Sequence, residues 1–310
     1  MHAIPLPGID GGNPLGFLAA LGTLRTAALM FPDAKPSLSW RRTGAWQPAL
    51  GVPVELSESE LCARLAERLA MMRGDPALGD AESARLGENL AVSVTQYRAY
   101  AKAAAEAANL GNRIWADFAA SFGTDGVGSS EAKLQDTGFR TMSGAGHQHF
   151  LGSIRELVSQ TTAENLHKAL FQPWVHDDDR PTMRWDPADD RRYAYRWSDP
   201  SSASRSPIRT VRGANRLAIE ALPLFPTLPT AQGAVTTGFL PGTRSRKPWR
   251  WPIWEPSCPI EVVRSLLSHP ALCSDPPARE VLAAMSVTEV YEAHRITVGK
   301  FRNFTSARAA

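Results

Sequence analysis

The most regular hydrophobic pattern in the chain follows Asn13-Pro14. Apolar residues recur there at the spacing of one helix face: Phe17, Leu21, Leu24 and Ala28. Asparagine is a good N-cap and proline fits the first helical position, so we expect a helix to begin here and to end before Pro32. Gly16 and Gly22 lower helix propensity, and we interpret them as sites of close approach by another backbone.

Further helices are predicted along the first half of the chain. Ser57 and Glu60 form a capping box ahead of an apolar stripe that ends at Met72, and Thr161 and Glu164 form a second one. Residues 89–109 and 148–159 also have helical composition and spacing. Before them, Leu38 and Trp40 alternate with serines, which predicts a short strand.

The amino-acid composition changes after residue 175, where Pro, Trp and Arg become frequent. Strands are predicted at residues 191–197, 234–239, 249–254 and 291–301, and helices at residues 259–268 and 277–285. We therefore predict an α+β fold with a helix-rich N-terminal domain (residues 1–175) and a basic mixed domain (residues 176–310). A Gly-rich loop at residues 123–146 is the first candidate for a working loop.

Composition places the chain among ordinary globular proteins, since 43% of its 310 residues are hydrophobic and 21% are charged. Cys62, Cys258 and Cys273 have no CxxC spacing, so neither a disulfide framework nor a zinc site is expected. This cysteine usage fits a reducing cytoplasm. No uninterrupted apolar stretch reaches about 18 residues, so we expect no membrane span.

Charge is concentrated in one segment. Residues 205–250 carry eight cations and one carboxylate, Glu220, a local charge of +7 in a chain whose total is +3. Trp249, Trp251 and Trp254 lie in or beside the same segment, and aromatic faces beside arginine suit unpaired bases. This strip predicts a polyanion surface, and a solvated face beside a tryptophan-rich core explains it equally well.

Histidines provide the catalytic candidates. His147 and His149 follow the Gly-rich segment and have the chemistry of a general base, although a helix N-terminus explains the same residues more commonly. His176 precedes Asp177, Asp178 and Asp179, which we interpret as a solvated turn rather than a metal site. No GxSxG, Walker-type, GxGxxG or HExxH motif occurs, so we expect a binding protein without cofactor or metal.

Residues 6–25 (LPGIDGGNPLGFLAALGTLR) resemble the start of CRISPR-associated proteins from type I-G systems, formerly type I-U. In those families an NPL-type turn leads into a helix reading LxALGxLR. Shorter similarities occur at residues 185–187, 213–218 and 298–305. The resemblance implies a large subunit of the Cascade surveillance complex, although known large subunits are often much longer than this chain.

A large subunit of this kind binds guide RNA and target double-stranded DNA and contacts other effector subunits. It also recognises the target-flanking motif (PAM) and helps to recruit a separate helicase-nuclease in trans. The resemblance therefore implies cations for phosphates, a loop for the flanking motif and polar side chains for base edges. The residues that we predict for these contacts are Lys133, Arg140, Gln148, Arg209, Arg212, Asn215, Arg216, Arg244, Arg246, Lys247, Arg250, Lys300 and Arg302.

Two other functions stay open at this point. One is a guide-RNA-processing endoribonuclease that uses His147 or His149 as general base and the preceding glycines as a phosphate cradle. The other is a scaffold whose basic strip docks on acidic protein partners.

Overall fold

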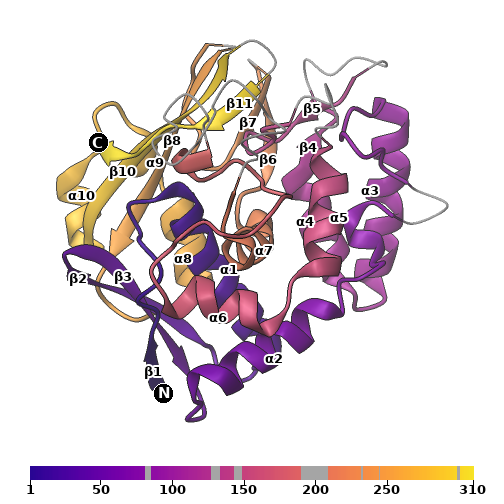
Figure 1. Ribbon diagram of the computed structural model, residues 1–310. Coiled ribbons are helices and arrows are strands. Elements are labelled where there is room, and N and C mark those ends of the chain that lie inside the picture. Colours follow the sequence, from indigo (N-terminus) through magenta and orange to yellow (C-terminus); the bar gives the residue numbers. More distant parts are fainter. Residues whose placement is uncertain are drawn as a thin grey trace.

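The computed structural model describes residues 1–80, 85–126, 133–142, 149–189, 209–231, 233–243, 245–298 and 301–310. Helix α1 (Pro14–Met30) lies near the centre of the molecule (Figure 1). Its cap is the predicted one, because Asn13 Oδ1 accepts hydrogen bonds from the backbone N–H groups of Leu15 and Gly16. The helix ends one residue before its C-cap Phe31, as the proline at position 32 predicts.

Helix α1 packs closely against α7 (Arg212–Ala221). A Cβ atom added at Gly22 would lie 1.7 Å from the carbonyl oxygen of Leu217. The interpretation of this glycine as a site of close backbone approach is therefore confirmed. Helix α7 itself was not predicted, and it is buried along nearly its whole length.

The N-terminal sheet is antiparallel and has the strand order β1-β3-β2-β9. Its strands are β1 (His2–Pro5), β2 (Ser37–Thr43), β3 (Ala45–Val52) and β9 (Cys258–Pro259). Strand β2 confirms the strand predicted around Leu38 and Trp40. The Trp40 ring stacks on that of Phe17 in α1, with centroids 5.8 Å apart, so the sheet covers one side of this helix.

The other side of the molecule is helical (Figure 1). It contains α2 (Glu58–Ala70), α3 (Val94–Asn109), α4 (Arg113–Phe122), α5 (Phe150–Gln160) and α6 (Ala163–Phe171), with the 3-10 turn η1 (Pro76–Leu78). The predicted capping box of Ser57 and Glu60 is confirmed. The second box lies one residue later than predicted: Thr162 and Asn165 form it, because the Thr161 hydroxyl donates instead to a carbonyl at the end of α5.

The C-terminal sheet is built on the long strand β10 (Val287–Val298), which pairs antiparallel with three neighbours. These are β8 (Arg246–Trp254), β11 (Phe301–Phe304) and β12 (Arg308–Ala309). Between β8 and β10 the chain forms α8 (Ile260–Leu267), α9 (Pro270–Cys273) and α10 (Arg279–Ala284). The smaller elements are β4 (Gly123–Thr124), β5 (Gln135–Asp136), β6 (Thr227–Thr230), β7 (Gly233–Thr236), η3 (Pro187–Asp189) and η5 (Leu222–Leu224). The strand predicted at residues 191–197 lies outside the described residues.

The three tryptophans of β8 belong to the core, so they form no platform for unpaired bases. Trp249, Trp251 and Trp254 are fully buried. The first two rings lie 4.5 Å apart, while Nε1 of Trp251 donates to the Gly11 carbonyl and Nε1 of Trp254 to that of Leu38. The core alternative for this segment is therefore the correct one.

Helices and small antiparallel sheets around a continuous core confirm the α+β class. The boundary predicted near residue 175 is crossed by the packing of α1 on α7 and by the pairing of β2 with β9. None of the helices in the described part of the chain combines the length and apolar character needed to span a bilayer.

Candidate nucleic-acid interface

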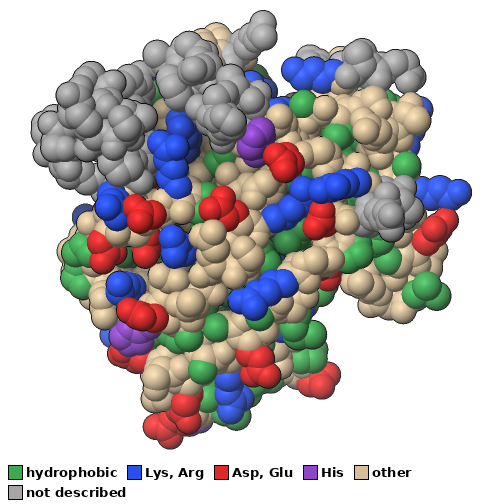
Figure 2. All heavy atoms as spheres, turned by 45° about the vertical axis from the view of Figure 1, so that its right-hand side comes forward, with side chains coloured by type: hydrophobic (Ala, Val, Ile, Leu, Met, Phe, Trp, Pro, Cys, Tyr) green, Lys and Arg blue, Asp and Glu red, His purple; other side chains and the backbone are tan. Residues whose placement is uncertain are grey.

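The predicted basic strip does not form one continuous surface. On the face shown in Figure 2, Lys and Arg side chains lie among carboxylates. The described cations of the strip are two buried arginines in ion pairs, an arginine pair bound to an acidic turn, the exposed Arg246, and Lys247, which lies beside cations from other segments. Each group has its own chemistry.

Arg216 is not a phosphate ligand in this structure, because it is 1% exposed. Its Nη1 donates to Glu220 Oε1 at 2.9 Å, and the other carboxylate oxygen of Glu220 accepts from Arg25 Nη1 at 2.6 Å. Burial acts to raise the pKa of Glu220, but the two guanidinium groups lower it more, so the pKa lies below its ordinary value. This buried triad joins α7 to α1.

Asn215 is also a structural residue rather than a reader of bases. Its side chain is fully buried, and its Oδ1 accepts the Met183 backbone N–H at 2.8 Å. Its Nδ2 donates to the Thr210 hydroxyl and to the Val211 carbonyl, both at 3.0 Å. The amide is saturated inside the protein.

Arg250 and Arg140 are buried against carboxylates and carbonyl groups, which corrects their assignment to a binding surface. Arg250 is 5% exposed, and its Nε donates to Glu292 Oε2 at 2.8 Å. Arg140 is 4% exposed, pairs with Asp136, and donates from Nε to the Met142 carbonyl. A buried guanidinium with these partners is not available to a polyanion.

Arg209 and Arg212 lie at the acidic run that follows His176. Arg209 Nη1 lies 2.8 Å from Asp179 Oδ1, and Arg212 donates to the Asp179 carbonyl. Asp178 Oδ2 accepts the backbone N–H of Arg212 at the start of α7. The sequence predicts a solvated turn here. In the structure the carboxylates of this turn also lie at the N-terminus of α7, where the helix dipole favours negative charge.

Lys247 and Arg302 from the predicted set lie at one end of the C-terminal sheet. Arg295 of β10 lies opposite Lys247 of β8, and Arg302 of β11 lies opposite the next residue on the same face of β10, Thr297. Arg302 donates from Nη1 to the Arg140 carbonyl at 3.3 Å. We call Lys247, Arg295 and Arg302 the basic cluster, which the buried Arg140 adjoins.

Among the described residues, positive charge exceeds negative charge around the basic cluster. Burial lowers the pKa of Arg295 to about 10, and the neighbouring charge of Arg302 acts in the same direction. Burial, followed by the charge of Arg295, also lowers the pKa of Lys247. Asp136 opposes both shifts, and it is the one carboxylate that acts on both groups in the described part of the chain.

Arg295 was missed by sequence reasoning. The sequence indicated its place through the alternation of the predicted final strand (residues 291–301), which puts Arg295 on the same strand face as Tyr291.

Other predicted residues lie apart from the basic cluster or are not described. Lys133 is exposed, and Arg246 is exposed on the opposite face of β8 from Lys247. Gln148, Arg244, Lys300 and the catalytic candidate His147 lie outside the described residues.

His149 has a local structural partner. It stands at the N-cap position of α5, and its Nδ1 lies 2.6 Å from Asn89 Oδ1. Glu88 Oε2 lies 3.6 Å from the same nitrogen. The His149 side chain makes no capping hydrogen bond, and the glycines that precede it are outside the described residues.

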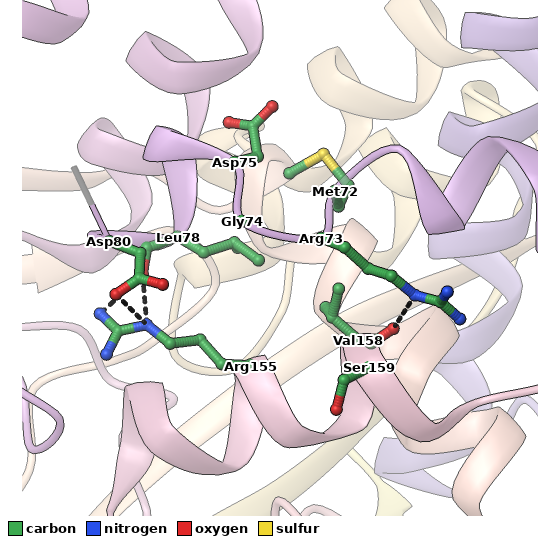
Figure 3. A pocket seen from close by; sticks show the side chains of 9 residues that line it. All are labelled: Met72, Arg73, Gly74, Asp75, Leu78, Asp80, Arg155, Val158 and Ser159. Atoms are coloured by element: carbon green, nitrogen blue, oxygen red, sulfur yellow. Dashed lines mark hydrogen bonds and ion pairs between the residues drawn. The ribbon is translucent and has the colours of Figure 1, made fainter.

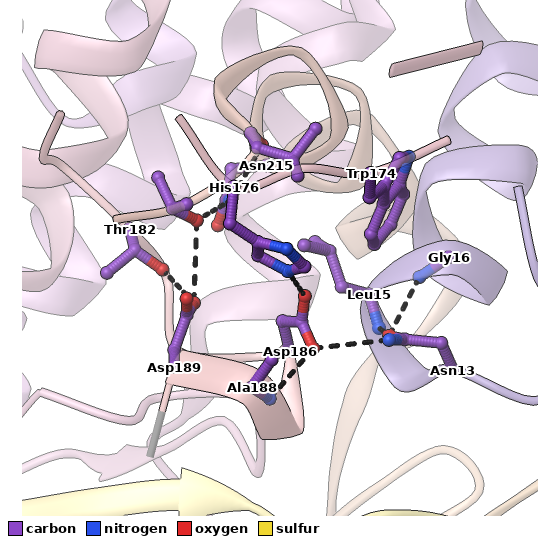
Figure 4. A network of polar contacts seen from close by, with 12 residues as sticks. Asn13, Leu15, Gly16, Trp174, His176, Thr182, Asp186, Ala188, Asp189 and Asn215 are labelled. Atoms are coloured by element: carbon purple, nitrogen blue, oxygen red, sulfur yellow. Dashed lines mark hydrogen bonds and ion pairs between the residues drawn. The ribbon is translucent and has the colours of Figure 1, made fainter. Parts of the chain in front are cut away.

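Two of the segments that carry the resemblance, residues 6–25 and 185–187, are in contact. Asp186, from residues 185–187, accepts hydrogen bonds from Nδ2 of Asn13 at 3.2 Å and from the backbone of Ala188 (Figure 4). Its other oxygen lies 2.7 Å from His176 Nε2. Burial acts to raise the pKa of Asp186, but these hydrogen bonds and the His176 ring hold it below its ordinary value. The network connects the start of α1 to η3.

Replacing Asn13 with alanine is expected to lower the free energy of unfolding by about 2 kcal/mol, because the helix cap and a bond to a buried carboxylate are both lost. Chemical denaturation measures the change. Asn13→Ser is the matched control, since serine keeps a capping oxygen and loses only the donor to Asp186. Equal destabilisation by the two substitutions would contradict a capping role.

A hollow of about 210 Å³ lies between η1 and α5 (Figure 3). Its two arginines are bound to the protein: Arg155 donates to the carbonyls of Leu78 and Gly79, and Arg73 donates to that of Val158. These bonds hold the wall of the hollow, so it is a poor candidate for ligand binding. No group of three His, Cys, Asp or Glu residues in the described ranges is arranged to hold a metal ion.

A comparison of the chain with models of known protein families finds no match, and neither does a comparison with curated proteins. The chemistry of the interface must therefore be inferred from its own residues.

Proposed function

We propose that this protein is a nucleic-acid-binding, large-subunit-like component of a cytoplasmic RNA-guided CRISPR type I effector complex. It would recognise the target-flanking motif, aid duplex opening and support recruitment of a separate helicase-nuclease. The proposal is supported by the resemblance of residues 6–25 and by the contacts of that segment with residues 185–187 and 213–218, through Asn13 with Asp186 and Gly22 with Leu217. Its partners would be guide RNA, target DNA and the other effector subunits.

The observation that carries the proposal is the basic cluster. Like charges held close together are unfavourable, and the lowered pKa values of Lys247 and Arg295 reflect that cost as well as burial. A phosphodiester chain would reduce this repulsion by adding negative charge. Lys247 and Arg302 are half-buried, so they reach the surface where a phosphate could approach.

Replacing Lys247 and Arg302 together with alanine is expected to reduce the dependence of binding on salt. Each lost phosphate contact changes the slope of log affinity against log salt concentration by about 0.9 for duplex DNA, so the double variant should lose about 2 units of slope. Fluorescence anisotropy over a range of salt concentrations measures the slope.

The matched control replaces two exposed cations on other elements, Arg64 of α2 and Lys102 of α3. This pair removes the same charge and should leave the slope within error of the parent protein. An unchanged slope in a folded Lys247/Arg302 variant would remove the basic cluster from the interface. A fall of equal size in the control would assign binding to net charge alone.

The endoribonuclease alternative makes a separate prediction. If the protein is a binding subunit, incubation with its repeat RNA in chelator should give no specific cleavage. Cleavage that disappears in a His147→Ala or His149→Ala variant would establish the enzyme instead. The scaffold alternative predicts assembly with partner proteins that survives nuclease treatment and shows no crosslink to RNA or DNA.

A further inference from the structure

A polar pocket lies on the face of the C-terminal sheet that is opposite to the basic cluster. Side chains alternate along a strand, so Arg246 and His294 point away from their neighbours Lys247 and Arg295 in the basic cluster. The pocket has a volume of about 380 Å³. It is lined by Arg246, Glu292, His294, Ile296, Thr305, Ser306 and Arg308.

His294 is the unusual residue in this pocket. It is only 9% exposed, yet neither ring nitrogen has a hydrogen-bond partner within the described part of the chain. Its Nε2 lies 3.2 Å from Glu292 Oε1, close enough for an ion pair but not aligned for a hydrogen bond. An unsatisfied buried polar group costs free energy, and a ligand that bonds to the ring would remove that cost.

The pocket favours an anion despite the presence of Glu292. The carboxylate is already engaged, because its Oε2 accepts from Arg250 Nε at 2.8 Å and its Oε1 accepts from Arg308 Nη2 at 3.2 Å. Arg250 is therefore paired with this carboxylate, and its Nη2 also lies 3.4 Å from Oδ1 of the exposed Asp275. Arg246 and Arg308, both with exposed side chains, then leave the pocket positive.

Hydroxyl groups complete the lining. The Oγ1 of Thr305 accepts the backbone N–H of His294 at 3.0 Å, which holds the segment with Thr305 and Ser306 against β10. The Thr305 hydroxyl donates to the Ser306 carbonyl, so the donors that face a ligand come from two guanidinium groups, an imidazole and the Ser306 hydroxyl. A tetrahedral group with several acceptor oxygens uses such a set better than a planar carboxylate does.

We propose that this pocket binds a phosphate group, either as a phosphomonoester at the end of a nucleic acid or as a free phosphorylated small molecule. The volume leaves space for the group that carries the phosphate. The site is separate from the basic cluster, so this proposal does not depend on whether the cluster binds nucleic acid.

Titration with inorganic phosphate tests the pocket directly. NMR signals of the His294 ring, assigned by their absence in His294→Gln, are expected to shift in a saturable way. Sodium chloride at equal ionic strength should not reproduce the shift. Arg246→Ala, which changes an exposed side chain, is expected to weaken phosphate binding about tenfold, the effect of one charge-assisted hydrogen bond. His294 signals that do not respond to phosphate would overturn the proposal.

Two RNAs of the same sequence identify the source of the phosphate. If a nucleic-acid end is bound, 5′-phosphorylated RNA should bind about tenfold more tightly than 5′-hydroxyl RNA, and Arg246→Ala should abolish the difference. If a free nucleotide is bound, adenosine 5′-monophosphate should shift His294 while the two RNAs bind equally. The salt slope of the 5′-hydroxyl RNA depends on internal phosphates, so it tests the basic cluster separately.

Discussion

Replacing Glu220 with glutamine is expected to lower the free energy of unfolding by about 3–5 kcal/mol. The substitution keeps the shape of the side chain but removes its charge, which leaves the guanidinium groups of Arg25 and Arg216 buried without a counterion. Arg25 is 3% exposed and Arg216 is 1% exposed, so water cannot replace the carboxylate without local opening. Urea denaturation followed by circular dichroism measures the loss.

The loss is expected to depend on pH. Because the pKa of Glu220 is lower in the folded protein than its ordinary value of 4.5, the carboxylate stabilises the fold above that value. This stabilisation disappears as the pH falls through the lower folded pKa. The parent protein and the Glu220→Gln variant should therefore converge in stability in acid.

Two further variants separate charge from packing. Replacing an exposed carboxylate on a helix, as in Glu280→Gln of α10, should change stability by less than about 0.5 kcal/mol. The triple variant Arg25→Met, Arg216→Met and Glu220→Leu should recover most of the lost stability, because no buried charge remains. A Glu220→Gln variant as stable as the parent would show that the triad contributes nothing.

Replacing Gly22 with alanine is expected to lower the free energy of unfolding by about 3 kcal/mol or to prevent folding. The added Cβ would lie 1.7 Å from the Leu217 carbonyl oxygen and 2.6 Å from its carbon, so α1 and α7 would have to separate. On an exposed helix the same change would stabilise by about 1 kcal/mol, because alanine is the better helix former. Thermal or chemical unfolding should therefore show that Gly22→Ala destabilises the protein, whereas the same change on an exposed helix would stabilise it.

Gly87→Ala is the matched control. At this exposed glycine an added Cβ would have no atom within 4 Å, and the backbone φ is not positive. Its replacement should change stability by less than about 0.5 kcal/mol. A Gly22→Ala variant that equals this control would mean that α1 and α7 are not in backbone contact at Gly22.

Local chemistry allowed the strongest predictions from sequence. The cap of α1 and the capping box of α2 depend on side chains within three residues of the groups they bond, so Asn13, Ser57 and Glu60 were assigned correctly. The second box was placed one residue early because Thr161 and Thr162 offer the same hydroxyl. In such a pair, the path of the backbone decides which residue caps.

The candidate site was harder to predict, because a local charge count does not reveal desolvation. Arg216 and Glu220 are four residues apart, and this pair would have been visible had α7 been recognised as a helix. Arg25 lies 195 residues from the same carboxylate, so nothing in its neighbourhood predicted the contact. Lys247 and Arg302 were predicted, but Arg295, which lies between them in the sheet, was not.

The sequence by itself determined where α1 and α2 begin, the α+β class and the segment in which cations concentrate. The tertiary structure alone decided which cations are buried with carboxylates and which share the end of a sheet. The physical reason is range: hydrogen bonds in caps and helical spacing act over a few residues, whereas burial and ion pairing depend on partners from any part of the chain. An arginine can therefore be a core group, as Arg216 is in α7, or a candidate phosphate ligand, as Arg302 is in β11.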